Sequence, residues 1–81
     1  MLPNPNYFHF ESGQLVYGYY GGANYSAGAI GGTITATSPQ PVDLFDWLYY
    51  THDLAYQNSS DPYVRLQADI QLAKGIYDLV F

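Results

Sequence analysis

The stretch PVDLFDWLYYTHDLAY, residues 41–56, decides how the rest of this sequence is interpreted. It has no glycine or proline after its first residue, and its large apolar side chains follow a helical period, which predicts a helix over residues 42–57. The residues that recur at steps of three and four are Phe45, Tyr49, His52 and Tyr56. Directly after His52 comes Asp53, in a run that is otherwise apolar and aromatic. Because an imidazole and a carboxylate are costly to bury without partners, the pair is either a solvated helix edge or a site of chemistry.

A second helix is predicted after the break NSSDP. Asp61 is a suitable N-cap and Pro62 suits the first helical position, so we expect this helix to cover residues 62–79. Its apolar stripe is predicted to be Leu66, Ile70, Ala73, Ile76, Tyr77 and Val80. Asp69 lies within that stripe, either as a tolerated interruption or because it has a partner. Two helices joined by a short connection pack antiparallel most simply, which brings Asp69 opposite His52.

The first part of the chain, residues 1–37, is rich in glycine, tyrosine, asparagine and small residues. Its stretch VYGYYGGANYSAGAIGG has no helical period, and its glycines permit the positive φ angles of tight loops. The stretch GTITATS, residues 32–38, alternates β-branched and small residues and predicts a short strand. The expected fold class is therefore mainly α, with two antiparallel helices that carry the candidate site after a glycine-rich loop and a short β element.

Composition and charge exclude several kinds of partner. The net charge is −5 and the only cations are Arg65 and Lys74, so the clustered basic residues that neutralise nucleic-acid phosphates are missing. The same balance argues against a strong electrostatic attraction to anionic membranes. There is no cysteine, and therefore no disulfide or cysteine-based metal site. Neither a signal peptide nor a membrane-spanning run is recognised, so we expect one soluble domain over residues 1–81, alone or within a longer chain.

The His-Asp pair permits a specific kind of chemistry. An imidazole that is hydrogen-bonded to a carboxylate can act as a general base, because the carboxylate fixes its tautomer and stabilises the cation. The chain has neither a cysteine nucleophile nor a Gly-x-Ser-x-Gly motif, so activated water is the better attacking species. Asp53 lies about 100° around the helix from His52 and can reach a neighbouring metal ion. Backbone carbonyls of the glycine-rich segment offer further oxygen ligands, which suit Ca²⁺.

The segments YGYYGGANYSAG and PVDLFDWLYYTHDLAY together resemble the calcium-dependent phospholipase A2 superfamily. The active-site helix of that family has the pattern D-x-C-C-x-x-H-D-x-C-Y, and Asp46, His52, Asp53 and Tyr56 stand in register with it. The family's calcium loop, Y-C-G-x-G, corresponds to residues 20–24 within the glycine-rich stretch. The form HDLAY is similar to the disulfide-free branch found in parvovirus capsid proteins and some bacterial proteins. DPYVRLQAD is similar to the segment that carries the second aspartate in the viral branch.

The resemblance implies a calcium-dependent phospholipase A2 domain that hydrolyses the sn-2 ester of glycerophospholipids at a membrane surface, in a secreted, virion or toxin protein. Its calcium loop would span residues 17–26. His52 would deprotonate the attacking water, and Asp69, hydrogen-bonded by Tyr56, would orient His52. The implied calcium ligands are the Asp53 carboxylate and the carbonyls of Tyr20, Gly22 and Asn24. The Gly22 N–H, together with the cation, would stabilise the oxyanion.

The sequence also departs from the family pattern. The family's cysteines are replaced by Gly21, Leu48, Tyr49 and Ala55, so aromatic packing is expected to supply the stability that disulfides give elsewhere. Asn24 stands where the family usually has glycine, and asparagine tolerates positive φ better than most residues. Two alternatives stay open: a catalytically silent calcium- or lipid-binding module on the same fold, and a Tyr/Gly-rich structural interaction protein.

Overall fold

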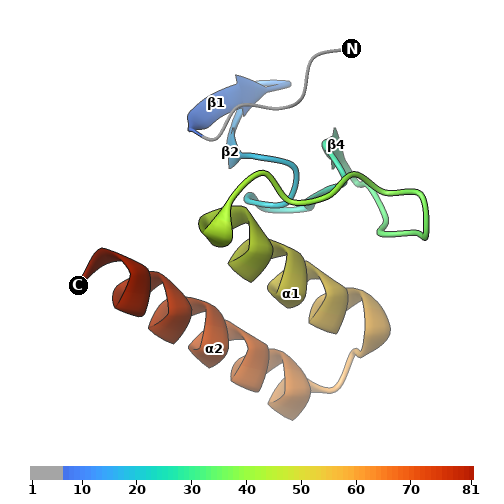
Figure 1. The fold of residues 1–81 in the computed structure, drawn as a ribbon. Coiled ribbons are helices and arrows are strands. Elements are labelled where there is room, and N and C mark those ends of the chain that lie inside the picture. Colours follow the sequence, from blue (N-terminus) through green and yellow to red (C-terminus); the bar gives the residue numbers. More distant parts are fainter. Residues whose placement is uncertain (1–6) are drawn as a thin grey trace.

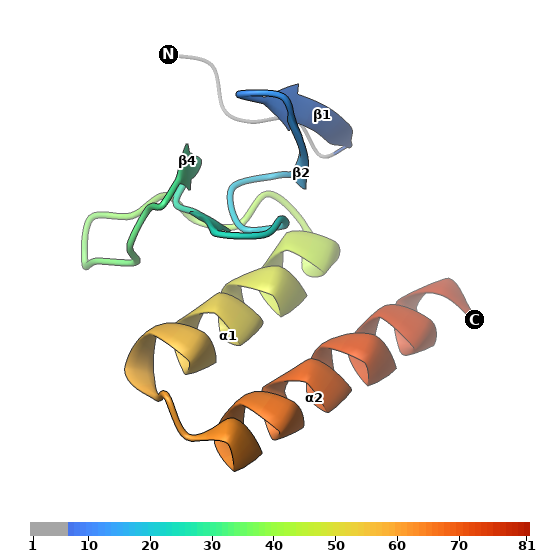
Figure 2. The ribbon, with the colours of Figure 1, turned by 180° about the vertical axis from the view of Figure 1, so that it is seen from behind.

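The computed structural model describes residues 7–81, which form two antiparallel helices and two small β-hairpins (Figure 1). In chain order the elements are β1 (Phe8–Glu11), β2 (Gln14–Tyr17), β3 (Tyr25–Ser26), β4 (Ala29–Ile30), α1 (Leu44–Asn58) and α2 (Pro62–Val80). Helix α1 lies between α2 and the hairpins, as both views show (Figures 1 and 2). The fold is therefore mixed rather than mainly α. The signal-peptide interpretation rests on residues 1–13, of which residues 1–6 lie outside the described residues.

Both helices begin where a side chain accepts a bond from their first N–H groups. The carboxylate of Asp43 caps α1 by accepting from the Asp46 N–H at 2.8 Å, so this helix begins two residues later than predicted. Asp61 caps α2 as predicted, accepting from the Tyr63 N–H at 2.9 Å, with Pro62 at the first helical position. Each helix ends one residue beyond its predicted boundary.

The connection between the helices is closed by Arg65. Its Nε donates to the Ser59 carbonyl at 2.8 Å and its Nη2 donates to the Tyr56 carbonyl at 3.1 Å. These carbonyls lie at the end of α1, where a helix leaves acceptors without intrahelical partners. The guanidinium also lies 4.6 Å from the centroid of the Tyr56 ring. One side chain of α2 therefore fixes both the end of α1 and the ring of Tyr56.

The helices pack through a different face of α2 from the one predicted. The half-buried residues of α2 are Arg65, Ala68, Leu72, Gly75 and Ile76. A Cβ at Gly75 would lie 2.5 Å from Cδ2 of Leu48, so the absence of a side chain at Gly75 lets the two helices approach closely. Of the predicted stripe, only Ile76 lies in this interface. Leu66 and Tyr77 are 53% and 62% exposed.

The difference between the predicted and the observed packing face of α2 has a simple cause. Apolar residues cover more than half of the circumference of α2, and one neighbouring helix can bury only part of them. The outer part remains as an exposed apolar face, defined by Tyr63, Leu66, Ile70, Ala73, Tyr77 and Val80. Within residues 7–81, no helix has both the length and the apolar character that a membrane crossing requires.

The strand predicted over residues 32–38 does not form. Ile34 at its centre makes both of its backbone hydrogen bonds with the side-chain amide of Gln57: its N–H donates to Oε1 at 2.8 Å, and its carbonyl accepts from Nε2 at 2.9 Å. Farther along, the Thr35 N–H donates to Oγ of Ser38 and closes a local turn. The backbone groups that a strand would offer to a neighbour are thus satisfied by side chains.

The strands lie instead in two hairpins that were not predicted. In each, two turn residues with positive φ join paired strands: Ser12 and Gly13 in the first hairpin, Ala27 and Gly28 in the second. Positive φ at both positions is the type I′ geometry, whose twist matches that of the flanking strands. The second hairpin returns to the loop before it, because the Gly28 N–H donates to the Tyr19 carbonyl at 2.9 Å.

A buried carboxylate joins α1 to the glycine-rich loop. Asp46 is fully buried and accepts hydrogen bonds from the N–H groups of Tyr19, Tyr20 and Val42, each at 3.0 Å. A Cβ at Gly18 would lie 2.4 Å from its carboxyl carbon, so the loop can approach only because this residue is glycine. Three N–H donors satisfy a charge that would otherwise be costly to bury. The loop is therefore attached to the first turn of α1.

Aromatic rings fill the space around this carboxylate. Tyr20 and Tyr25 are buried, and the ring of Tyr20 meets that of Tyr50 edge to face with centroids 4.9 Å apart. Gly21 and Tyr49, which the resemblance aligns with two cysteines, are neighbours: a Cβ at Gly21 would lie 2.8 Å from Cδ2 of Tyr49. Aromatic packing thus occupies the region in which disulfide replacement was expected.

Candidate functional site

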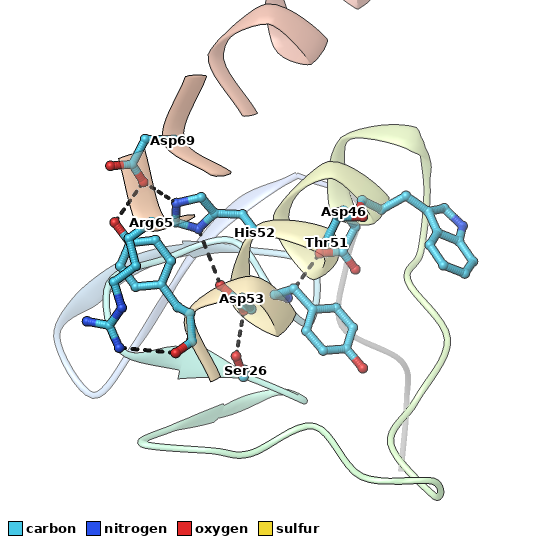
Figure 3. A network of polar contacts seen from close by, with 10 residues as sticks. Ser26, Asp46, Thr51, His52, Asp53, Arg65 and Asp69 are labelled. Atoms are coloured by element: carbon cyan, nitrogen blue, oxygen red, sulfur yellow. Dashed lines mark hydrogen bonds and ion pairs between the residues drawn. The ribbon is translucent and has the colours of Figure 1, made fainter. Parts of the chain in front are cut away.

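The predicted juxtaposition of His52 and Asp69 is present between the two helices. Nε2 of His52 lies 2.7 Å from Oδ1 of Asp69, and the hydroxyl of Tyr56 donates to the same oxygen at 2.7 Å (Figure 3). The imidazole also packs against the Tyr56 ring, with the ring centroids 4.6 Å apart and the ring planes tilted by 32°. Asp69 is thus placed on α2 where it contacts two side chains one helical turn apart on α1.

This contact determines which nitrogen of His52 can act as a base. The hydrogen bond from His52, and then that from Tyr56, lower the pKa of Asp69, so its carboxylate is the ionised acceptor. An ionised carboxylate only accepts, which assigns the proton of the neutral imidazole to Nε2. The lone pair of His52 is then at Nδ1, on the side of Asp53. The hydrogen bond that the Tyr56 hydroxyl donates to Asp69 raises the pKa of this hydroxyl.

Asp53 lies on the opposite side of His52 from Asp69. Its Oδ1 is 3.9 Å from Nδ1 of His52, and its Oδ2 accepts a hydrogen bond from Oγ of Ser26 at 2.5 Å (Figure 3). Burial raises the pKa of Asp53 to about 7, although the hydrogen bond from Ser26 and the charge of His52 act in the opposite direction. Desolvation is therefore the dominant effect on this carboxyl, as expected for an acid whose ionised form has no full counter-charge beside it.

The glycine-rich loop and α1 enclose a cavity of about 610 Å³. Among the residues that line it are Tyr20, Gly22, Asn24, Ser26, His52, Asp53 and Tyr56. Every site residue predicted on the loop and on α1 therefore borders one space. Asp69 does not line this cavity and reaches it only through His52 and Tyr56.

The loop backbone has the geometry that its residue types predict. Gly22 has φ 154°, and a Cβ there would lie 2.8 Å from Cγ1 of Val16, so no larger residue fits. Asn24 adopts φ 51°, the positive angle that asparagine tolerates. Gln14 on β2 holds the loop by donating from Nε2 to the Ala23 carbonyl at 2.5 Å.

The three carbonyls proposed as metal ligands differ in their surroundings. The Asn24 carbonyl already accepts a hydrogen bond from the Gly31 N–H at 2.6 Å, at the end of the β3–β4 hairpin. Between residues 7 and 81, no hydrogen bond is made to the carbonyls of Tyr20 or Gly22. Two of the three carbonyls are thus without a competing donor, and the third has one lone pair in use.

The oxygen atoms around the cavity are of the kind that binds a hard cation. No group of three or more His, Cys, Asp and Glu side chains capable of holding a metal is found in the described part of the chain. A cation here would therefore depend on one carboxylate, from Asp53, and on neutral oxygens. Such ligands are typical of Ca²⁺, whereas Zn²⁺ sites use histidine and cysteine. The side chain of Asp53 is only 15% exposed, so a cation beside it would offset its desolvation.

Two contributors to the site were missed in the sequence. Ser26 bonds Asp53 from β3, and Gln14 holds the loop from β2. Neither belongs to a motif of its own, and each acts through a hairpin that was not predicted. Asp46 was recognised as part of the helix motif, but its three bonds to backbone N–H groups were not predicted.

We compared the chain with protein-family models, with curated proteins and with solved structures, and none of these comparisons found a match.

The raised pKa of Asp53 predicts how the stability of the metal-free chain depends on pH. In the unfolded chain this carboxyl titrates near pH 4, and in the native chain at about pH 7. Between these values the native state holds a proton that the unfolded state has released, so the free energy of unfolding falls as the pH rises. Asp53→Asn removes this titration and should flatten the decline. Urea denaturation at pH 4.5 to 8 with chelator, for both chains, measures the difference. A wild-type stability that rises relative to Asp53→Asn through this range would contradict the assignment.

Proposed function

We propose that the chain is a calcium-dependent phospholipase A2 that hydrolyses the sn-2 ester of glycerophospholipids with water activated by His52. The observation that carries the proposal is the arrangement of the two carboxylates about one imidazole: Asp69 at Nε2, and Asp53 on the side of Nδ1. The first is suited to orienting a base and the second to holding a cation next to it. The glycine-rich loop borders the same cavity.

In the proposed reaction, Nδ1 of His52 accepts a proton from water as the water oxygen attacks the ester carbonyl. Asp69 stabilises the imidazolium that forms, and Tyr56 keeps the Asp69 carboxylate in place. His52 then returns the proton to the leaving alkoxide. The Gly22 N–H is the proposed donor to the oxyanion.

Asp53 and the carbonyls of Tyr20, Gly22 and Asn24 are the proposed calcium ligands. The bound cation supplies Lewis-acid polarisation of the ester carbonyl and neutralises the developing negative charge. The carboxylate of Asp53 provides the one negative charge of this ligand set, and the neutral oxygens complete it.

The exposed apolar face of α2 supports a phospholipid surface as the partner. Five of its six residues are large, and the face carries no charged side chain. It borders Asp69, which lies about one helical turn from Leu66 and from Ala73. An apolar face next to the candidate site is suited to contact a bilayer that holds the substrate, and the shortage of cations in the chain leaves apolar contact as the main source of affinity.

The catalytically silent binding module is the second candidate, and one observation favours it. The side chain of Asp69 is 49% exposed, so water screens its interaction with His52. A screened carboxylate stabilises an imidazolium less than a buried one does, while a calcium site at Asp53 would be unaffected. The two candidates therefore differ in whether Asp69 matters for turnover.

Asp69→Asn tests this difference. We expect the wild type to release fatty acid from phospholipid vesicles with Ca²⁺ and to release none with chelator. We expect Asp69→Asn to reduce turnover by about tenfold or more, since the orienting charge acts mainly in the transition state. The calcium-dependent shift in melting temperature should stay unchanged in this variant.

Asp78→Asn is the matched control, because it removes the same charge from the polar face of α2, which is formed by Gln67, Gln71, Lys74 and Asp78. Asp69→Leu should also lose activity if Asp69 orients His52, whereas a tolerated interruption would leave this variant active and more stable. A wild-type chain that shifts its melting temperature with Ca²⁺ but releases no fatty acid would support the silent module. Full activity in both Asp69 variants would exclude Asp69 as the orienting group.

The membrane partner is tested by adding one charge to either side of α2. Ile70→Asp should lower hydrolysis of vesicles by about tenfold or more, because losing the burial of one such side chain costs about 1.5 kcal/mol. Gln71→Asp adds the same charge on the polar face and should have little effect. Hydrolysis of a short-chain phospholipid below its micelle concentration should be the same for both variants. Equal vesicle activity of the two variants would remove this face from membrane contact.

A further inference from the structure

The β3–β4 hairpin places one hydroxyl at the wall of the candidate calcium site. Ser26 is the last residue of β3, is 9% exposed, and pairs with Ala29 across the hairpin. The hairpin is held at both ends, by the Gly31 N–H on the Asn24 carbonyl and by the Gly28 N–H on the Tyr19 carbonyl. The backbone of Ser26 is therefore fixed relative to the loop that carries the proposed carbonyl ligands.

Through this hydroxyl the hairpin reaches the Asp53 carboxylate. Oγ of Ser26 donates to Oδ2 of Asp53 at 2.5 Å, across a sequence separation of 27 residues. The side chain of Asp53 is only 15% exposed, and its other oxygen lies 3.9 Å from Nδ1 of His52. Ser26 thus provides the close hydrogen bond that fixes the orientation of this carboxylate, while the lone pairs of Oδ1 and one of Oδ2 remain available.

We propose that Ser26 is a positioning residue for calcium binding, which holds the Asp53 carboxylate in the orientation that receives the cation. This inference rests on the proposed calcium site and adds a residue that the family resemblance does not assign. The physical reason is preorganisation: a carboxylate already fixed by a hydrogen bond loses less side-chain freedom when the cation binds. Hydrogen bonds to ligating carboxylates have this effect in other metal sites.

A purely structural role for the same bond makes a different prediction. If Ser26 only ties the hairpin to α1, its loss should lower the stability of the metal-free chain and leave the affinity of the folded chain for calcium unchanged. A positioning role lowers the affinity itself. Calcium affinity and metal-free melting temperature, measured on the same variants, separate the two roles.

The experiment measures Tb³⁺ luminescence sensitised by the tyrosines, with displacement by Ca²⁺, on the full chain. We expect Ser26→Ala to weaken calcium affinity by about tenfold, the lower end of the range for lost outer hydrogen bonds to metal ligands. Ser60→Ala, which removes an exposed hydroxyl from the connection between the helices, is the matched control and should bind as the wild type does.

A second pair of variants separates the hydroxyl from side-chain volume. Ser26→Thr keeps the hydroxyl and Ser26→Val has the same shape without it, so we expect Ser26→Thr to bind calcium about tenfold more tightly than Ser26→Val, in line with the loss of one outer hydrogen bond. This pair decides the question if Ser26→Ala does not fold. Equal affinity of Ser26→Thr and Ser26→Val, or of Ser26→Ala and wild type, would overturn the role of Ser26 and leave the calcium site standing. A wild-type chain that binds neither ion would overturn the calcium site as well.

Discussion

The arrangement of the whole domain depends on the carboxylate of Asp46. It lies in the first turn of α1, where the helix dipole favours a negative charge, and three backbone N–H groups satisfy it in a fully buried position. Two of these N–H groups belong to Tyr19 and Tyr20, so the loop cannot leave α1 without exposing or orphaning a buried charge. The buried carboxylate of Asp46 therefore links the loop to α1 in a domain that has no disulfide.

The same constraint aligns the candidate site. Asp53 comes seven residues after Asp46, which is two helical turns, and the two carboxylates consequently share one face of α1. The loop that is held by Asp46 continues past Gly22 along this face until it meets Asp53 through Ser26. On a neighbouring face, His52 points toward α2 and Asp69. One helix thus presents a structural carboxylate, a candidate ligand and a candidate base at fixed spacing.

What the sequence predicts well here is local. The Asp61 cap, the Pro62 signal and the period of α1 predict both helices to within two residues, and antiparallel packing then places Asp69 at His52. The hairpins illustrate the limit. Ser12-Gly13 between alternating residues was a usable turn signal, whereas Ala27 gives none, because alanine rarely adopts the positive φ that it has here.

The features that were predicted wrongly or missed depend on tertiary contacts. Gln57 satisfies the backbone of Ile34 and so replaces the partner strand that residues 32–38 would need. On α2, a different face from the predicted one packs against α1, because Gly75 has no side chain and Leu48 can lie against it. Ser26 reaches Asp53 only after the β3–β4 hairpin has formed. None of these contacts has a period or a motif, because each joins residues that are distant in the sequence.

We propose that the loop held by Asp46 and the carboxylate of Asp53 form one calcium site. Its most direct test is a calcium titration followed by ¹⁵N–¹H correlation spectra of the full chain. If this site binds calcium, the amide signals of residues 20–24 and of Asp53 should shift together and saturate, with an equal dissociation constant at each. Shifts confined to exposed acids such as Asp61 and Asp78, or no change at residues 20–24, would contradict it.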